Sequence, residues 1–224
     1  MRCAMILFGI VGGVWPAEMA FGIIWDKGNL IYMAASIIAA IVIINAAEFY
    51  YLISEIIMTS RTRQGTDDAF DRGTNRLVWI FVASAFIIAW LPVILDFGRL
   101  LVLGDWLTWA GVAIMISGIV FRQYAISILG KFFTATVQIQ KDHELIKAGP
   151  YRYIRHPSYL GILIISLGLG IALANWISLL LCLVLPVIGV IQRIKVEEKE
   201  LERHFGKQYQ DYRKSTWCVV PYIY

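Results

Sequence analysis

Residues 149–161, GPYRYIRHPSYLG, concentrate side chains that can bind a charged ligand just before a long apolar run. His156 and the N–H groups that follow Pro157 can meet a carboxylate, and the ring faces of Tyr151 and Tyr159 attract cations. The same residues also suit a purely structural role. Pro157 is favoured in the first turn of a helix, and arginine and tyrosine are typical of a membrane boundary. The segment is therefore either a helix anchor or part of a binding site.

A second polar segment, residues 193–214 (RIKVEEKELERHFGKQYQDYRK), follows the last apolar run. Its apolar residues recur every three or four positions, which predicts an amphipathic helix that continues this run. Arg193 and Glu197 lie one helical turn apart and are candidates for chemistry. Each also has a simpler interpretation. Arg193 could simply extend from a helix end to water, and Glu197 could be a solvated charge on the helix surface.

The composition indicates the kind of elements that position these residues. Of 224 residues, 59% are hydrophobic and 16% charged, and the mean hydropathy is +0.68. Soluble domains have about a quarter charged residues, so this composition predicts a membrane protein. The last apolar run is too long for one span and is broken at 172–176, which predicts a hairpin and about six spans in all. The apolar runs are 3–25, 30–57, 77–97, 106–129 and 159–192.

The basic residues predict the orientation of these spans. If the loops alternate between the two sides, all but three of the 20 lysines and arginines fall on one side. The exceptions are Lys27 and Arg99 on the opposite side and Arg122 inside a span. Basic residues favour the cytoplasmic side, so both termini are expected there. Because topology accounts for the basic excess, we expect no nucleic-acid partner.

The two halves of the chain differ in character. We predict that residues 1–129 form a four-helix transmembrane region. Residues 130–224 are predicted to form a catalytic membrane region with a binding loop, the helical hairpin and a cytoplasmic C-terminal helix. Ionisable groups inside spans are candidates for function. For Glu48 and Glu55 structural pairing is the favoured interpretation, and the role of Arg122 stays open.

Metal and disulfide chemistry find little support in the sequence. The cysteines are not closely paired, and the histidines are scattered along the chain. We therefore expect neither a bound metal nor a disulfide framework. These residues are Cys3, Cys182, Cys218, His143, His156 and His204.

The order of residues in the two polar segments resembles a known enzyme family. HELIKAGPYRYIRHPSYLG, followed after an apolar hairpin by QRIKVEEKELERHFGKQYQDY, is similar to the C-terminal half of the isoprenylcysteine carboxyl methyltransferase family. The similarity covers about 138–212. It implies an all-α membrane bundle that binds S-adenosylmethionine in a non-Rossmann pocket formed with the cytoplasmic C-terminal helix. Gly168 and Gly170 lie inside an apolar run, which indicates close helix packing rather than a nucleotide-binding turn.

The resemblance also implies roles for individual residues. Arg193 corresponds to the family's substrate arginine, and Glu197 can pair with the donor's ammonium or offset its sulfonium charge. A carboxylate acceptor is already ionised at neutral pH, so Arg193 would orient it and no general base is required. The cofactor contacts of the family fall on Gln138, His143, Glu144, Leu145, Ile146, Tyr151, His156, Pro157, Ser158, Tyr159 and Glu197.

The acceptor is expected to be lipophilic and to enter from the membrane lipids, most simply as the carboxylate of a prenylcysteine-like molecule. The membrane would be the plasma or inner membrane of a bacterium, or the endoplasmic reticulum of a eukaryote. Three alternatives stay open. One is a phospholipid or amine N-methyltransferase, and another is a non-catalytic scaffold. The third is an NADPH-dependent sterol-type reductase, which WCVVPYIY at 217–224 resembles.

Overall fold

The computed structural model describes residues 27–62, 73–98, 104–133 and 144–221, and these residues are almost entirely helical. In this part of the chain the only β-type pairing is an isolated bridge between Ile154 and Trp217. The predicted all-α class is confirmed. The helices are α2 (Lys27–Thr62), α3 (Thr74–Ile88), α4 (Trp90–Ile94), α5 (Gly104–Leu129), α6 (Pro157–Ala172), α7 (Trp176–Phe205) and α8 (Lys207–Ser215), with 3₁₀ turns at Gly130–Phe132 and Gly149–Arg152.

Four stretches of these helices are long and apolar enough to cross a membrane. They are Ala35–Met58, Thr74–Ile94, Trp106–Leu129 and Trp176–Phe205. α6 is apolar but has only 16 residues. The first predicted span, 3–25, lies outside the described residues.

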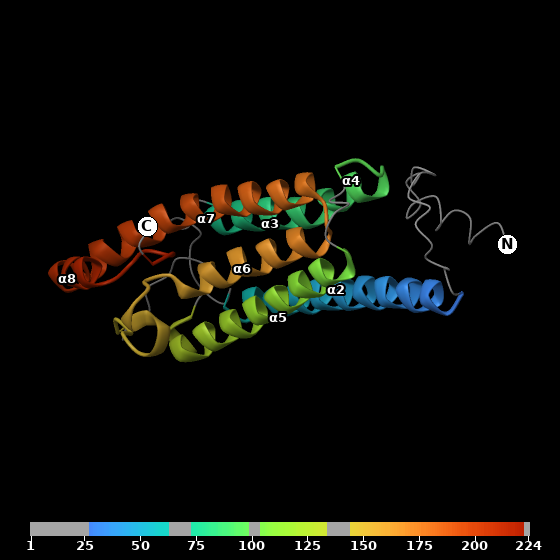
Figure 1. Cartoon of the computed structure of the whole chain (residues 1–224). Helices are drawn as coiled ribbons and strands as arrows, with labels where there is room; N and C mark the ends of the chain where they lie inside the picture. Colours follow the sequence, from blue (N-terminus) through green and yellow to red (C-terminus); the bar gives the residue numbers. More distant parts are fainter. Residues whose placement is uncertain (1–26, 63–72, 99–103, 134–143, 222–224) are drawn as a thin grey trace.

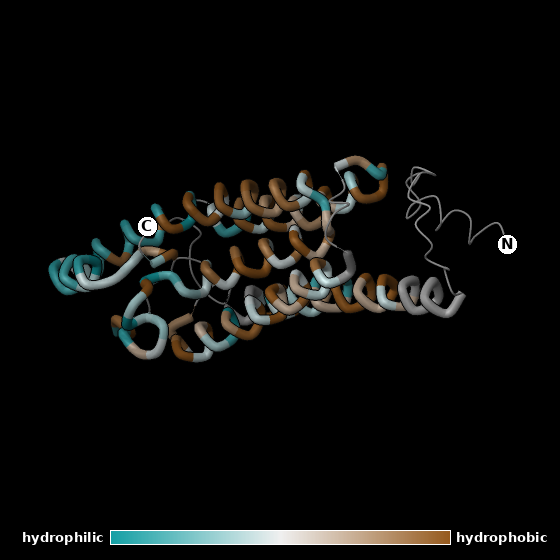
Figure 2. The backbone as a smooth tube through the Cα atoms, viewed as in Figure 1, coloured by the Kyte–Doolittle hydropathy of each residue, from teal (hydrophilic) through white to brown (hydrophobic). Residues whose placement is uncertain are grey.

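The helices form an elongated bundle with α6 at its centre (Figure 1). α5 and α7 both pack against α6, α3 packs against α7, and α2 packs against α5. Hydrophobic residues dominate the long helices, whereas hydrophilic residues gather at the end that carries α8 (Figure 2). The polar segments found in the sequence therefore lie together at one end of an apolar bundle.

A tight turn joins α6 to α7 where the sequence predicted the hairpin break. Ala174 adopts a left-handed backbone conformation, with φ of 46°, and Asn175 caps α7. The Asn175 side chain accepts hydrogen bonds from the N–H groups of Ile177 and Ser178, at 3.0 and 3.2 Å. Such a cap satisfies N–H groups that have no partner inside the helix, so the apolar run divides into two antiparallel helices.

Four glycines, which we call the glycine seam, let α5 and α6 pack with their backbones in contact. A Cβ atom on Gly118 would lie 2.7 Å from the backbone nitrogen of Ile165, and one on Gly161 would lie 2.6 Å from Cβ of Arg122. Side chains larger than hydrogen do not fit at these distances. The close packing predicted for Gly168 is confirmed. The seam consists of Gly111 and Gly118 on α5 and Gly161 and Gly168 on α6.

Substitution of Gly168 by alanine is expected to destabilise the protein. The new Cβ would overlap the backbone of Met115, so the helices must separate. Overpacking of this kind costs about 1–3 kcal/mol, and we expect a lower Tm in detergent micelles. Ala39→Val, on an exposed part of α2, is the control and should leave Tm nearly unchanged. An unchanged Tm for Gly168→Ala would contradict the packing of the seam.

The C-terminal amphipathic helix differs from its prediction in one respect. The sequence predicted one continuous helix over 193–214, but α7 ends at Phe205 and α8 begins at Lys207. Gly206 has φ of 53° and ψ of −123°, a conformation that glycine adopts without steric cost. The break at Gly206 separates α8 from α7, and Tyr209 and Tyr212 of α8 are both buried.

Candidate functional site

The segment before α6 is held in place by the end of the chain. Gly149 has φ of 55° and starts a 3₁₀ turn, and Pro157 occupies the first turn of α6 as predicted. The N–H of Arg155 donates to the carbonyl of Trp217 at 2.8 Å, and the N–H of His156 donates to the carbonyl of Cys218 at 3.0 Å. The C-terminal segment therefore lies along residues 153–156 and fixes their backbone.

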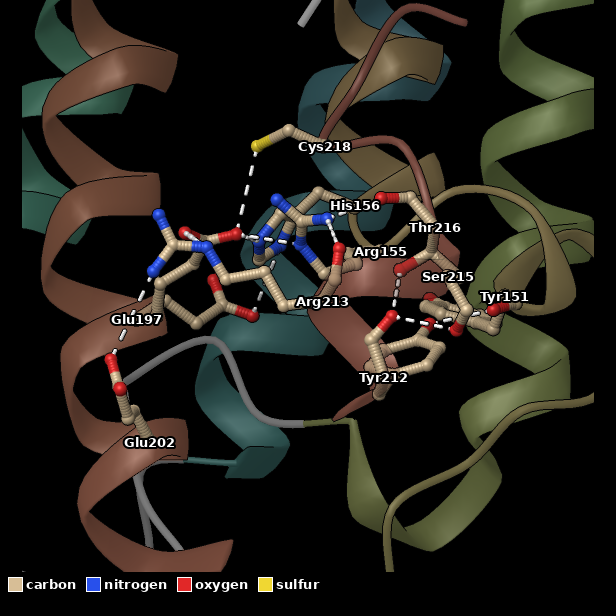
Figure 3. A network of polar contacts seen from close by, with 11 residues as sticks. Tyr151, Arg155, His156, Glu197, Glu202, Tyr212, Arg213, Ser215, Thr216 and Cys218 are labelled. Carbon is tan, nitrogen blue, oxygen red and sulfur yellow. Dashed lines mark hydrogen bonds and ion pairs between the residues drawn. The ribbon is translucent and has the colours of Figure 1, made fainter. Parts of the chain in front are cut away.

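Glu198 of α7 joins three groups from these two segments. Its Oε1 accepts a hydrogen bond from Arg155 Nε at 2.8 Å, and it lies 3.4 Å from His156 Nε2. The Cys218 thiol donates to the same oxygen at 3.7 Å. Figure 3 shows Arg155, His156, Thr216 and Cys218 gathered in this network. Glu198 thus links α7 to the start of α6 and to the C-terminal segment.

This network also brings together three side chains that could bind a metal ion and that the sequence analysis did not group. One atom each of His156, Glu198 and Cys218 lie within 4.8 Å of one another, a spacing at which a metal ion is conceivable on geometry alone. The Arg155 guanidinium, however, already donates to the same Glu198 oxygen. A cation at this place would have to compete with that charge, so we interpret the group as a structural ion-paired cluster.

Cys218 is expected to react slowly with alkylating reagents. Burial and the nearby Glu198 carboxylate raise the pKa of the Cys218 thiol to about 11. Because the thiolate is the reactive form, iodoacetamide at pH 8 should modify Cys218 about a hundredfold more slowly in the folded than in the denatured protein, and faster as the pH approaches 11. Mass spectrometry of a variant with serine at Cys3 and Cys182 measures this rate. Equal rates in both states would contradict the burial.

Glu197 is next to Glu198 in the sequence but contacts a different set of side chains. The Tyr159 hydroxyl donates to Glu197 Oε2 at 2.6 Å, and His156 Nδ1 lies 3.8 Å from Glu197 Oε1. The side chain of Glu197 is 29% exposed, compared with 13% for Glu198. Of the two adjacent glutamates, Glu198 therefore braces the fold, whereas Glu197 remains accessible to a ligand.

Arg193 is buried rather than solvated, with 3% of the residue exposed. Its Nε donates to the Tyr159 hydroxyl at 3.2 Å, and its Nη1 donates to Thr74 Oγ1 at 3.0 Å. An arginine that extends to water would not be enclosed in this way, so the simpler interpretation of Arg193 is wrong. Tyr159 connects Arg193 directly to Glu197.

A second buried arginine, Arg122, bonds to the first turn of α6. Arg122 of α5 forms an ion pair with Glu55 of α2, and its Nε lies 2.6 Å from Glu55 Oε1. Its Nη1 also donates to the carbonyl of Ser158 at 2.9 Å. The structural pairing predicted for Glu55 is confirmed, and its partner is the intramembrane arginine. Through Ser158 this pair links α2 and α5 to the first turn of α6.

Many of these side chains line one pocket at the polar end of the bundle, whereas Glu198, Cys218 and Thr74 do not. Gln138 and His143 lie outside the described residues, and Pro157 does not line the pocket. Several lining residues were not predicted, among them Asn75, Trp79, Tyr209 and Tyr212. The apolar face of the C-terminal helix was the only sequence signal for the two tyrosines. The predicted site residues that do line it are Glu144, Leu145, Ile146, Tyr151, His156, Ser158, Tyr159, Arg193 and Glu197.

Comparison with known proteins relates this pocket to one family. Residues 111–203 match the model of the "Isoprenylcysteine carboxyl methyltransferase (ICMT) family", and they include Arg155–Tyr159, Arg193 and Glu197. Over residues 111–203 the chain is similar to the isoprenylcysteine carboxyl methyltransferase family. The resemblance predicted from the polar segments is therefore confirmed.

Two curated members of the isoprenylcysteine carboxyl methyltransferase family illustrate the similarity. The protein-S-isoprenylcysteine O-methyltransferase of Dictyostelium discoideum is 39% identical over 120 residues, which are 53% of this chain and 51% of that protein. Protein-S-isoprenylcysteine O-methyltransferase B of Arabidopsis thaliana is 35% identical over 120 residues, which are 53% of this chain and 61% of that protein. The chain thus covers only about half to three fifths of these relatives.

A solved structure supports the same family at the level of the fold. The eukaryotic intramembrane Ras methyltransferase ICMT superposes with a TM-score of 0.53 at 30% identity, over 66% of this chain and 52% of that one. With the four long apolar helices, this similarity indicates an integral membrane protein. The reductase, the amine methyltransferase and the scaffold are not favoured by any of these similarities.

Proposed function

We propose that this protein transfers a methyl group from S-adenosylmethionine to the carboxylate of a lipophilic, prenylcysteine-like acceptor. The observation that carries the proposal is the meeting of two distant segments around one pocket. Tyr159, at the start of α6, joins Glu197 and Arg193 of α7 through its hydroxyl. The names of the family relatives supply the reaction class, and the pocket supplies an anionic and a cationic group for the two reactants.

The chemistry of the pocket suits a cationic donor. Glu197 provides a negative charge, and the rings of Tyr151, Tyr159 and Tyr209 line the same pocket. Carboxylates and aromatic faces both attract cations. When bound, S-adenosylmethionine supplies a methyl group activated by its sulfonium charge. Of the remaining predicted cofactor residues, Gln138, His143, Glu144, Leu145, Ile146, His156 and Ser158 are proposed to enclose the rest of the donor. Pro157 does not line the pocket and is proposed to act only through the start of α6.

Arg193 is proposed to bind the acceptor carboxylate. Its guanidinium is held by Thr74 and Tyr159 within the pocket wall, so its orientation is fixed before the acceptor arrives. An ionised carboxylate needs no base, and the chain therefore has to position two reactants and exclude water. Val78, Trp79 and Ile162 also line the pocket and offer apolar contacts to a lipophilic acceptor.

The membrane arrangement is part of the proposal. We propose six spans, both termini in the cytoplasm and a pocket that opens to the cytoplasm, because most basic residues fall in the loops on one side of the predicted spans. The donor would then enter from water and the acceptor from the bilayer. The division into a transmembrane region, 1–129, and a catalytic region, 130–224, also stays a prediction.

Transfer of a tritiated methyl group tests this function. Purified protein in lipid micelles is incubated with labelled S-adenosylmethionine and N-acetyl-S-farnesylcysteine. We expect labelled product that releases volatile methanol on treatment with base, since a methyl ester hydrolyses whereas N-methyl and S-methyl groups do not. The same acceptor with its carboxyl group converted to an amide is the control and should stay unlabelled. Base-stable label, or no label, would contradict carboxyl methylation.

A further inference from the structure

Two tyrosine hydroxyls in the pocket are buried and have no hydrogen-bond partner among the described residues. They belong to Tyr151 and Tyr209, which are 5% and 1% exposed. The hydroxyls of two other tyrosines of the same pocket do have hydrogen-bond partners. Tyr159 donates to Glu197, and Tyr212 donates to the carbonyl of Tyr151 at 2.6 Å. Buried polar groups almost always have partners, so the hydroxyls of Tyr151 and Tyr209 are available to bond a ligand that enters the pocket.

The charges around these hydroxyls limit which ligand group can bond them. Burial and Glu197 raise the pKa of Tyr151 above its usual value, and burial, Glu198 and Glu197 raise the pKa of Tyr209. Arg122 and Arg155 act in the opposite direction, and both are paired with glutamates. Both hydroxyls are therefore neutral at pH 7 and lie within electrostatic reach of the Glu197 carboxylate. A ligand carboxylate would be repelled there, whereas an ammonium group would be attracted.

An ammonium group also matches the number of acceptors. It has three N–H donors, and the pocket offers the Glu197 carboxylate and the two hydroxyl oxygens. We propose that Tyr209, together with Tyr151 and Glu197, binds the ammonium group of the methyl donor. This inference rests on the proposed function and adds Tyr209 of α8 to the binding residues. It also gives the break at Gly206 a role, since the break sets the direction of the helix that carries Tyr209.

The test uses Tyr209→Phe in the full chain, which removes only the hydroxyl oxygen. Calorimetry measures the affinity for S-adenosylhomocysteine and for its analogue that lacks the α-amino group. We expect Tyr209→Phe to bind S-adenosylhomocysteine about tenfold more weakly than the parent protein, because a hydrogen bond to a charged group is lost. Affinity for the deaminated analogue should be the same in both proteins. The Tm without ligand should not fall, because the lost oxygen has no protein partner.

Two further variants keep the test decisive. Tyr212→Phe removes a hydroxyl that does have a protein partner, so it should lower Tm. Tyr151→Phe repeats the binding measurement and replaces Tyr209→Phe if the latter does not fold. Unchanged affinity for S-adenosylhomocysteine, or an equal loss with the deaminated analogue, would overturn the inference while leaving the proposed function intact. Failure of the parent protein to bind S-adenosylhomocysteine would refute the proposed function itself.

Discussion

Glutamine in place of Glu197 is expected to weaken the binding of S-adenosylhomocysteine by about 10- to 100-fold, since hydrogen bonds to charged groups contribute about 1.5–3 kcal/mol. The substitution keeps the shape of the side chain and removes its charge. Glu197 is the accessible acid of the pocket and accepts a hydrogen bond from Tyr159. The neutral amide can still accept that bond, so the fold should persist. Calorimetry in detergent micelles measures the affinity.

Glu200→Gln provides the matched control for this result. Glu200 lies on the same helix and does not line the pocket. Its Oε2 lies 3.9 Å from Arg203 Nη1. The control should bind S-adenosylhomocysteine with the affinity of the parent protein. If the two variants bind equally well, Glu197 is a solvated helix charge after all, and the proposed donor site loses its anionic group.

Arg193→Ala is expected to reduce methyl transfer by about 100- to 1,000-fold, because loss of a buried, hydrogen-bonded charge that meets a carboxylate costs about 2–5 kcal/mol. Donor affinity should change by less than about threefold, since Arg193 is assigned to the acceptor alone. The decisive comparison is therefore the rate of transfer against the Kd for S-adenosylhomocysteine, both measured on one preparation.

Two variants separate the charge of Arg193 from its packing. Arg193→Lys keeps the charge but loses the planar fork that bonds Thr74 and Tyr159, so we expect partial activity. Lys195→Ala, at an exposed position of α7, should retain full transfer. If Arg193→Ala lost donor binding and transfer together, the arginine would be a structural link between α3 and α7 and not an acceptor contact.

The features predicted from the sequence are those set by local chemistry. Apolar run length predicted α2, α5 and the α3–α4 span, and the polar break at 172–176 predicted the turn that Asn175 caps. Pro157 predicted the first turn of α6. In each case a few neighbouring residues determine the backbone, so no knowledge of distant contacts is needed.

The features that were missed depend on residues far apart in the chain. Glu197 and Glu198 are adjacent, and the sequence does not show which of them has a structural role. The hydrogen bond from Arg155 identifies Glu198 as the structural residue. Arg122 and Glu55 are 67 residues apart, and no local pattern pairs them. Residues from the first half of the chain, such as Asn75, also line the pocket. All the site residues predicted from the sequence lie in the second half.

The attachment of the C-terminal segment has a consequence for biosynthesis. Arg155 bonds the carbonyl of Thr216, which leaves the ribosome 61 residues later. Until then, the residues around His156 have emerged without the backbone partners supplied by Trp217 and Cys218. A nascent chain can therefore insert its early helices into the bilayer, yet it acquires a complete binding pocket only after residues 216–218 have been translated.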